Sequence, residues 1–284
     1  MKNDCVDVII PTYNSLPYLK QTIDSVLSQT YKNLKLYIID DGSTDKTADY
    51  IKKLKDPRII YKYKSNGGQA TARNMGIRIS NSPYIAFLDA DDLWRKDKLE
   101  MQVKVMKKHH KVGMVYAFHT IIDEDNKVQG VVNYRKSGML FNYLLRGNRI
   151  SGSASMVLIR REAFNNLGLF HEDFLIGEDW EMWLRISRAF EIFCIPRYLA
   201  DLRVHEGGMQ RNYVKMARGL DYMMPIMVKE YGLRGYKKIS LKATCLFDSA
   251  MNYYMADDLE TARKRIRKLV TIAPVSYTHL TLPT

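Results

Sequence analysis

The stretch Phe87-Leu88-Asp89-Ala90-Asp91-Asp92-Leu93-Trp94 places three acids directly after an apolar run. That run, Tyr84 to Leu88, has the length and composition of a buried strand in a parallel sheet. Ligands of open α/β sheets bind beyond the carboxyl ends of such strands. Asp89 and Asp91 suit a shared divalent cation, because hard cations prefer carboxylate oxygens. The alternative is a solvated turn that caps a helix beginning near Arg95.

Three earlier strands are predicted, and each of them also ends in polar or turn-forming residues. The strands and the residues that follow them are Val6–Ile10 with Pro11-Thr12-Tyr13-Asn14, Leu34–Ile39 with Asp40-Asp41-Gly42, and Ile59–Tyr63 with Ser65-Asn66-Gly67-Gly68. Apolar residues at helical spacing separate the strands. This alternation predicts an α/β fold with a mostly parallel, Rossmann-like sheet flanked by helices, in which the polar strand ends line one crevice.

The second half of the chain changes character near residue 210. Two short strands are expected around Pro196, at Phe193 to Ile195 and Tyr198 to Val204, and the pattern is helical from Tyr213 to Ile272. We therefore predict a domain at residues 1–210 and a C-terminal helical extension at 211–274. Residues 275–284 fit no element and resemble an adapter oligonucleotide translated in frame, so we interpret them as a non-native tail, with an ordinary disordered tail as the alternative.

The composition of the 284 residues, 46% of them hydrophobic, is that of a globular protein with a sizeable core. The three cysteines, Cys5, Cys194 and Cys245, lie far apart and favour reduced thiols over a disulfide framework. Neither a signal peptide nor a membrane-spanning run is visible, so a cytoplasmic location is expected.

The formal net charge of +13 requires an explanation, and much of the excess lies late in the chain. Basic residues outnumber acids between Arg203 and Lys242, and Arg263-Lys264-Arg265 follows. Such a basic end either contacts the anionic inner face of a membrane or forms a solvated helix surface. We favour the solvated surface, because no clean apolar face accompanies the charge. Nucleic acid is not expected as a partner, since the predicted crevice is lined by acids that repel phosphate.

Five motifs resemble those of the family 2 inverting glycosyltransferases with the GT-A fold, over roughly residues 4 to 208. They are Val8-Ile9-Ile10-Pro11-Thr12-Tyr13-Asn14, Ile39-Asp40-Asp41-Gly42-Ser43, Ala72-Arg73-Asn74, Asp89-Ala90-Asp91-Asp92 and Glu178-Asp179. The resemblance implies a nucleotide-diphospho-sugar donor, a divalent cation and single-displacement transfer to an acceptor hydroxyl. A saccharide or a lipid-linked sugar is the implied acceptor, in the synthesis of a surface polysaccharide or glycolipid.

For the donor, the resemblance implies a base pocket formed by Pro11, Thr12, Tyr13 and Asp41. Tyr13 would stack on the base, and Asp41 would accept the N–H of a uracil-type ring, a bond that a carboxylate can make. Arg73 would face the diphosphate or the nucleotide edge, since its planar donor fork suits phosphate oxygens. A UDP-sugar is favoured by the family pattern, and guanine is not excluded.

The same resemblance assigns Asp89 to the donor ribose or sugar, and Mg²⁺ or Mn²⁺ to Asp91. His205 would help to hold the cation or a phosphate, although a lone histidine is equally often structural. Asp92 would either assist at the metal or cap the following helix.

Asp179 is implied to be the general base, and Glu178 to orient the sugar or the acceptor. Trp180 would offer an aromatic plate to the acceptor, although tryptophans on a helix more often fill a core. The Gln-x-x-Arg-Trp motif of processive synthases is missing after Asp179, so one sugar is expected per visit.

Two alternatives belong to other classes. A sugar-phosphate nucleotidyltransferase shares the nucleotide crevice, but it needs a glycine-rich basic loop after the first strand, where this chain has Pro11-Thr12-Tyr13-Asn14. A non-catalytic nucleotide-sugar-binding module, or a basic membrane-associated module, would keep the crevice without turnover.

Overall fold

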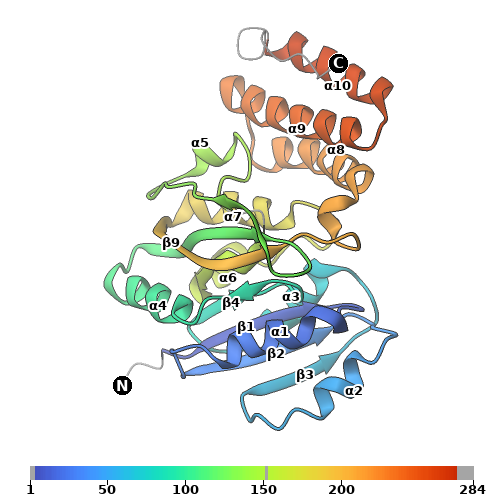
Figure 1. Cartoon of the computed structure of the whole chain (residues 1–284). Coiled ribbons are helices and arrows are strands. Elements are labelled where there is room, and N and C mark those ends of the chain that lie inside the picture. Colours follow the sequence, from blue (N-terminus) through green and yellow to red (C-terminus); the bar gives the residue numbers. More distant parts are fainter. Residues whose placement is uncertain (1–3, 151–152, 274–284) are drawn as a thin grey trace.

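The computed structural model describes residues 4–150 and 153–273 (Figure 1). Within these residues nine strands form one sheet, in the order β3-β2-β1-β4-β8-β6-β9-β5, and β7 pairs with β6. The strands are β1 Val6–Thr12, β2 Leu34–Asp40, β3 Ile59–Tyr63, β4 Tyr84–Phe87, β5 Leu93–Trp94, β6 Val112–Ile122, β7 Val128–Val132, β8 Leu158–Arg160 and β9 Glu191–Arg203.

The sheet has a parallel half and a mixed half. Strands β3, β2, β1 and β4 run parallel to one another, and the mostly apolar runs of β1, β2 and β4 are typical of strands that helices cover on both faces. Beyond β4, β8 runs antiparallel to both β4 and β6, while β9 is parallel to β6. The predicted α/β fold is therefore confirmed, and its parallel part is the N-terminal half of the sheet.

Strand β9 is one element where two short strands were expected. Its pairing with β6 shifts register between Ala117, opposite Ile195, and Phe118, opposite Tyr198. Pro196 lies within this shift. Because proline has no N–H to donate, it interrupts the ladder locally, and a bulge absorbs the extra residues without ending the strand.

Helices cover the sheet and extend beyond it. They are α1 Leu16–Leu27, α2 Thr47–Lys52, α3 Gln69–Ile79, α4 Lys98–Lys108, α5 Phe141–Leu144, α6 Arg161–Leu167, α7 Glu178–Ala189, α8 Tyr213–Glu230, α9 Gly235–Met255 and α10 Leu259–Ile272. Helix α3 approaches β1 closely because residue 76 is glycine: a Cβ there would lie 2.6 Å from Cγ2 of Ile9. This close packing fixes the N-terminal end of α3 near the strand ends.

The three C-terminal helices stack at the end of the molecule away from α2 and β3 (Figure 1). Leu220, Met223 and Met227 of α8 and Leu241 of α9 belong to the same core cluster as Phe87 of β4. The helical segment thus packs on the α/β part through a shared apolar core, and its separation as a domain at residue 210 stays a prediction. The predicted tail, residues 275–284, lies outside the described residues. Among the helices described, none combines the length and apolar character needed to cross a bilayer.

Candidate active site

The ends of β1 and β2 form one side of the site. Thr12 and Asp40 are register partners, so Tyr13 and Asp41 follow side by side. The Tyr13 ring is 50% exposed, whereas Pro11 and Thr12 are buried. The Asp41 carboxylate accepts the backbone N–H groups of Gly67 and Gly68, at 3.0 and 2.7 Å. It therefore holds the loop before α3 against the end of β2.

Asp41 also forms an ion pair with Lys64, whose Nζ reaches the same Oδ1 as the N–H of Gly67. A carboxylate has about four acceptor positions, so three donors leave room for one more. The Thr12 hydroxyl is buried without a hydrogen-bond partner among the described residues. The assignment of Tyr13, Thr12 and Asp41 to a base pocket stays a prediction, and the exposed ring beside a buried carboxylate is compatible with it.

Arg73 connects two acids from distant parts of the chain. Its Nη1 donates to Oε1 of Glu178 at 2.6 Å, and its Nη2 donates to Oδ1 of Asp89 at 2.7 Å. The residue is only 2% exposed, on the inner face of α3. Arg73 thus points into the protein, where carboxylates occupy both ends of its donor fork. Its contact with the diphosphate or the nucleotide edge, which the family resemblance implies, stays a prediction.

Several hydrogen bonds hold Asp89 in place. Besides Arg73, Gln69 donates to Oδ1 at 2.7 Å and the Ser153 hydroxyl to Oδ2 at 2.8 Å. Its backbone N–H donates to the hydroxyl of Ser155 at 2.9 Å. This network fixes the first acid after β4 in one orientation, with part of its side chain still exposed.

Asp179 lies in the first turn of α7, one residue after the partner of Arg73. It keeps partial exposure, and its Oδ2 accepts from Nδ2 of Asn148 at 3.3 Å. Burial, and then repulsion from Glu178, raise the pKa of Asp179 to about 7, although the Arg73 charge opposes this. A carboxylate whose pKa lies near neutral pH, with one face open, has the properties of a general base.

Asp91 and His205 meet at the other edge of the acid cluster. Nε2 of His205 lies 3.0 Å from Oδ2 of Asp91, and the His205 ring packs on Tyr18 with centroids 4.7 Å apart. The backbone carbonyl of Asp91 accepts from Nε of Arg203 at 2.8 Å. The two side chains that the resemblance assigned to a cation are thus adjacent, although 114 residues separate them in the sequence.

Asp92 is buried beneath this pair. Its carboxylate accepts from the Ser155 hydroxyl at 2.6 Å and from the backbone N–H of Arg203 at 2.9 Å. Burial, together with the charges of Asp91 and Asp89, raises the pKa of Asp92 well above its usual range. Asp92 therefore anchors the loop after β4 to Ser155 and to the last residue of β9, Arg203. Asp91 remains the accessible carboxylate.

This donor set fits a hard divalent cation. A carboxylate and an imidazole are ligands that Mn²⁺ accepts, and Mg²⁺ commonly takes only one or two carboxylates with water and phosphate filling the rest. Burial is the main cause of the raised pKa of Asp92, and repulsion from the negative charges of Asp91 and Asp89 adds to it. A cation bound by Asp91 and His205 would relieve that repulsion.

Residues 7–168 match the family model described as Glycosyl transferase family 2. The chain belongs to this family. It is 33% identical over 255 residues to an Escherichia coli protein named UDP-Glc:alpha-D-GlcNAc-diphosphoundecaprenol beta-1,3-glucosyltransferase WfaP, covering 88% of this chain and 94% of the relative. The chain spans only about a third of the length of uncharacterized Rickettsia glycosyltransferases that it also matches.

Solved structures of GT-A glycosyltransferases share the fold of this family 2 chain. S. aureus TarS in complex with UDP-GlcNAc superposes with a TM-score of 0.68 at 16% identity, covering 95% of this chain and 81% of that one. The mannosyltransferase PcManGT from Pyrobaculum calidifontis, in complex with GDP-Man and Mn²⁺, gives a TM-score of 0.65 at 19% identity, covering 98% and 76%. The GT-A fold expected from the sequence motifs is thereby confirmed.

Trp180 corrects one expectation for the site. It is 3% exposed within the main core cluster, and its indole N–H donates to the carbonyl of Leu144 at 2.8 Å. A ring enclosed on both faces cannot stack on an acceptor sugar. Trp180 instead ties α7 to α5, because a buried indole needs a partner for its N–H.

Several polar residues of the site were missed in the sequence. Gln69, Asn148, Ser153 and Ser155 each bond to one of the acids described above. Three of them lie in the segment between β7 and β8, where no element pattern guides a prediction. The run Ser151-Gly152-Ser153-Ala154-Ser155 was the one available signal, and a hydroxyl-rich loop is ordinarily assigned to a turn.

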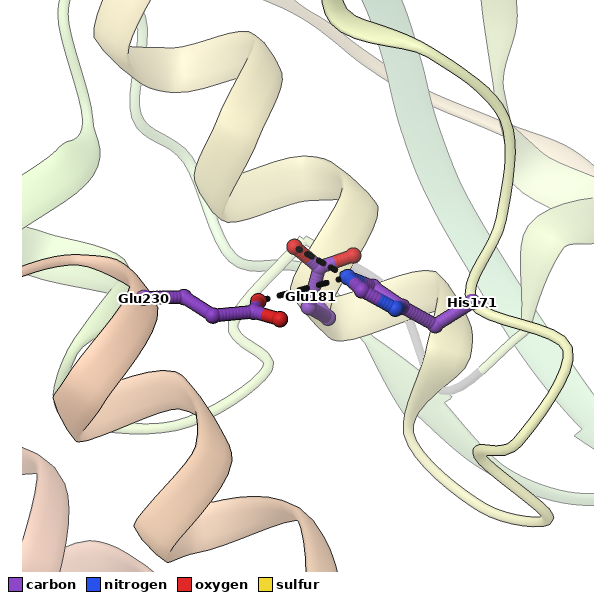
Figure 2. Close-up of side chains that lie close together, drawn as sticks. All are labelled: His171, Glu181 and Glu230. Atoms are coloured by element: carbon purple, nitrogen blue, oxygen red, sulfur yellow. Dashed lines mark ion pairs between the residues drawn. The ribbon is translucent and has the colours of Figure 1, made fainter.

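A second group of possible metal ligands lies away from the site. His171, Glu181 and Glu230 converge from the loop before α7, from α7 and from the end of α8 (Figure 2). Nε2 of His171 lies 3.3 Å from Oε2 of Glu230 and 3.9 Å from Oε1 of Glu181. The Glu181 carboxylate is already occupied, since Arg185 donates to Oε2 and the Tyr231 hydroxyl to Oε1. We therefore interpret the group as a clamp that fastens α8 to α7.

Glu181→Gln is expected to lower the free energy of unfolding by about 3 kcal/mol, because it removes a fully buried charge whose partner, Arg185, stays largely buried. The matched control is Glu230→Gln, whose side chain is 43% exposed and should cost less than about 1 kcal/mol. Urea titration of both variants measures the difference. Equal losses would argue against the clamp and for a ligand shared by the three residues.

Proposed function

We propose that the chain is a metal-dependent, inverting glycosyltransferase that moves one sugar from a UDP-sugar to an acceptor hydroxyl. The observation that carries the proposal is a series of contacts across the site. Asp179 follows Glu178 in α7, Glu178 pairs with Arg73, and Arg73 pairs with Asp89. This series ties a carboxylate with a pKa near 7 to the acid that follows β4, at the carboxyl ends of the strands. An acid poised as a base beside a nucleotide crevice is what transfer to a hydroxyl requires.

In this reaction Asp179 removes the proton of the acceptor hydroxyl, and the oxygen attacks the anomeric carbon from the face opposite the diphosphate. Inversion at that carbon follows from the single displacement. Asp89, fixed by Arg73 and Ser153, faces the donor, and Glu178, fixed by the same arginine, orients the sugar or the acceptor beside the base. Asp91 and His205 would hold Mg²⁺ or Mn²⁺, which when bound supplies positive charge to the leaving diphosphate.

The donor and acceptor classes rest on the relatives. The E. coli relative is named for UDP-Glc and for an acceptor linked to diphosphoundecaprenol, and it is matched over nearly its whole length. A UDP-sugar and a lipid-linked saccharide are therefore the substrates that we propose, with the protein at the cytoplasmic face of the membrane. The Trp180 to Arg185 segment lacks the motif of processive synthases, which supports a single addition per visit.

The test is donor hydrolysis by the purified chain. UDP-glucose, UDP-N-acetylglucosamine, UDP-galactose and GDP-mannose are incubated separately with the protein and Mn²⁺, and release of the nucleoside diphosphate is measured. Slow release from a UDP-sugar is expected, with loss on chelation and recovery on adding Mn²⁺. A folded protein that binds UDP and turns over none of these donors would instead indicate a non-catalytic binding module.

The transfer rate is expected to rise with pH through about 7. Asp179 accepts a proton only when ionised, and burial together with Glu178 raises its pKa to about 7. In the free enzyme, kcat/KM should therefore fall about tenfold for each pH unit below that value and level off above it. Initial rates across neutral pH, at subsaturating acceptor, measure this. A flat profile would contradict the assignment of Asp179 as the base.

A further inference from the structure

Basic side chains, most of them exposed, gather where the end of α5 meets the start of α9. They are Arg146, after α5, and Arg234, Lys237, Lys238 and Lys242, at the start of α9; we call this surface the α5–α9 basic face. Two contacts join its parts. The Arg146 guanidinium donates to the Tyr236 hydroxyl, and the hydroxyl of Thr244 donates to the carbonyl of Leu145 at 3.2 Å. The segments are thus adjacent, although about ninety residues separate them.

The charges of this face are unbalanced. Within residues 4–150 and 153–273, none of its five basic side chains forms an ion pair. Helix α10, the other basic region, is different: Arg265 pairs with Asp221 at 2.5 Å, and Lys264 with Glu260 at 2.6 Å. The excess charge that the sequence distributes over all the late helices is therefore least compensated on the α5–α9 basic face.

Apolar side chains stand among these charges. In the first turn of α9, Tyr236 is 64% exposed and Ile239 is 41% exposed, on either side of Lys237 and Lys238. Lysines flanked by an aromatic and an aliphatic residue are the composition of surfaces that lie in the headgroup region of a bilayer. Tyr236 also contacts the Arg146 guanidinium, so the exposed ring belongs to the same face as the charges.

The face also adjoins the acceptor side of the site. Asn148, two residues after Arg146, donates to Asp179, and the carbonyl of Leu144 accepts from Trp180. A membrane contacted by α5 and α9 would therefore lie near the base rather than near the nucleotide end, where β2 and β3 are. Helix α10 has no such connection, because within the described part of the chain it packs chiefly on α9.

We propose that the α5–α9 basic face docks on an anionic bilayer and so presents Asp179 to the lipid-linked acceptor. The proposal rests on the function proposed above. Its chemistry is the attraction of Arg146, Arg234, Lys237 and Lys238 to lipid phosphates, with Tyr236 and Ile239 entering the headgroup region.

The test is flotation of the full chain with vesicles of phosphatidylcholine alone or mixed with phosphatidylglycerol. Binding is expected only to the anionic vesicles, and it should weaken as salt is added. The double substitution Lys237→Gln with Lys238→Gln is expected to weaken binding about 30-fold. The matched control, Arg267→Gln with Lys268→Gln on α10, removes the same charge from an exposed face and should bind nearly as the unchanged chain does.

Donor hydrolysis in solution is measured on the same proteins. If the Lys237 and Lys238 variant hydrolyses a UDP-sugar normally but no longer binds vesicles, the proposal is supported. Equal binding by both double variants, equal binding to neutral vesicles, or no vesicle binding by an active chain would overturn it. If the unsubstituted chain hydrolyses no UDP-sugar, the proposed function is overturned instead, so the two failures are distinguishable.

Discussion

Asp179→Asn is expected to reduce kcat about 1,000-fold, the scale of a lost general base. The amide has nearly the shape of the carboxylate and can still contact Asn148, but it cannot take the proton of the acceptor hydroxyl. Nucleotide binding should persist, because Asp179 lies at the first turn of α7, away from Tyr13 and Asp41. Steady-state transfer rates and calorimetric titration with UDP and Mn²⁺ measure the two properties separately.

The same variant should not lose stability. A carboxyl whose pKa is raised from 3.8 to about 7 by folding binds more protons in the native state, so its contribution to stability falls as pH rises between those values. Removing the charge is therefore neutral or stabilising above pH 7. Asp173→Asn, in the exposed loop before α7, is the matched control and should leave both properties unchanged. Undiminished turnover in Asp179→Asn would refute the assignment.

The parallel half of the fold could be predicted because three of its four strands, β1, β2 and β4, are almost entirely buried. Apolar runs such as Val8 to Ile10 identify β1 without reference to any partner, and the turn formers after each run place its end. The strand order beyond β4 could not be predicted. Strand β8 has three residues and lies between β4 and β6, and β5 has two, so neither carries a periodic pattern.

The candidate site, like the fold, could be predicted from the sequence only in part. Residue types at strand ends indicated where the acids gather, since the carboxyl ends of parallel strands share one edge. The direction of each side chain depends on tertiary packing. Trp180 is a core residue because α5 covers it, and no local signal in α7 distinguishes that from exposure. Arg73 was ambiguous for a chemical reason: its donor fork matches a phosphate and a pair of carboxylates equally well.

Arg73→Met is expected to lower the free energy of unfolding by about 3 to 5 kcal/mol, because it leaves Asp89 and Glu178 largely buried without their shared cation. The matched control is Arg78→Met, on the same helix. Arg78 pairs with Glu172 on the surface, where both side chains are well exposed, and the change should cost less than about 1 kcal/mol. Chemical denaturation of the two variants gives the comparison.

Arg73→Lys separates a positioning role from contact with the diphosphate. Lysine keeps the positive charge but is a single ammonium, so it cannot bridge Asp89 and Glu178 as the two Nη atoms do. We expect kcat to fall and the pH profile of transfer to shift, because the charge balance around Asp179 changes, while the affinity for UDP stays the same. If Arg73 instead held the diphosphate, loss of its charge-assisted bonds would weaken UDP binding about tenfold or more. Weaker UDP binding with an unshifted pH profile would show that Arg73 binds the diphosphate. Its pairing with Asp89 and Glu178 would then have no part in positioning the base.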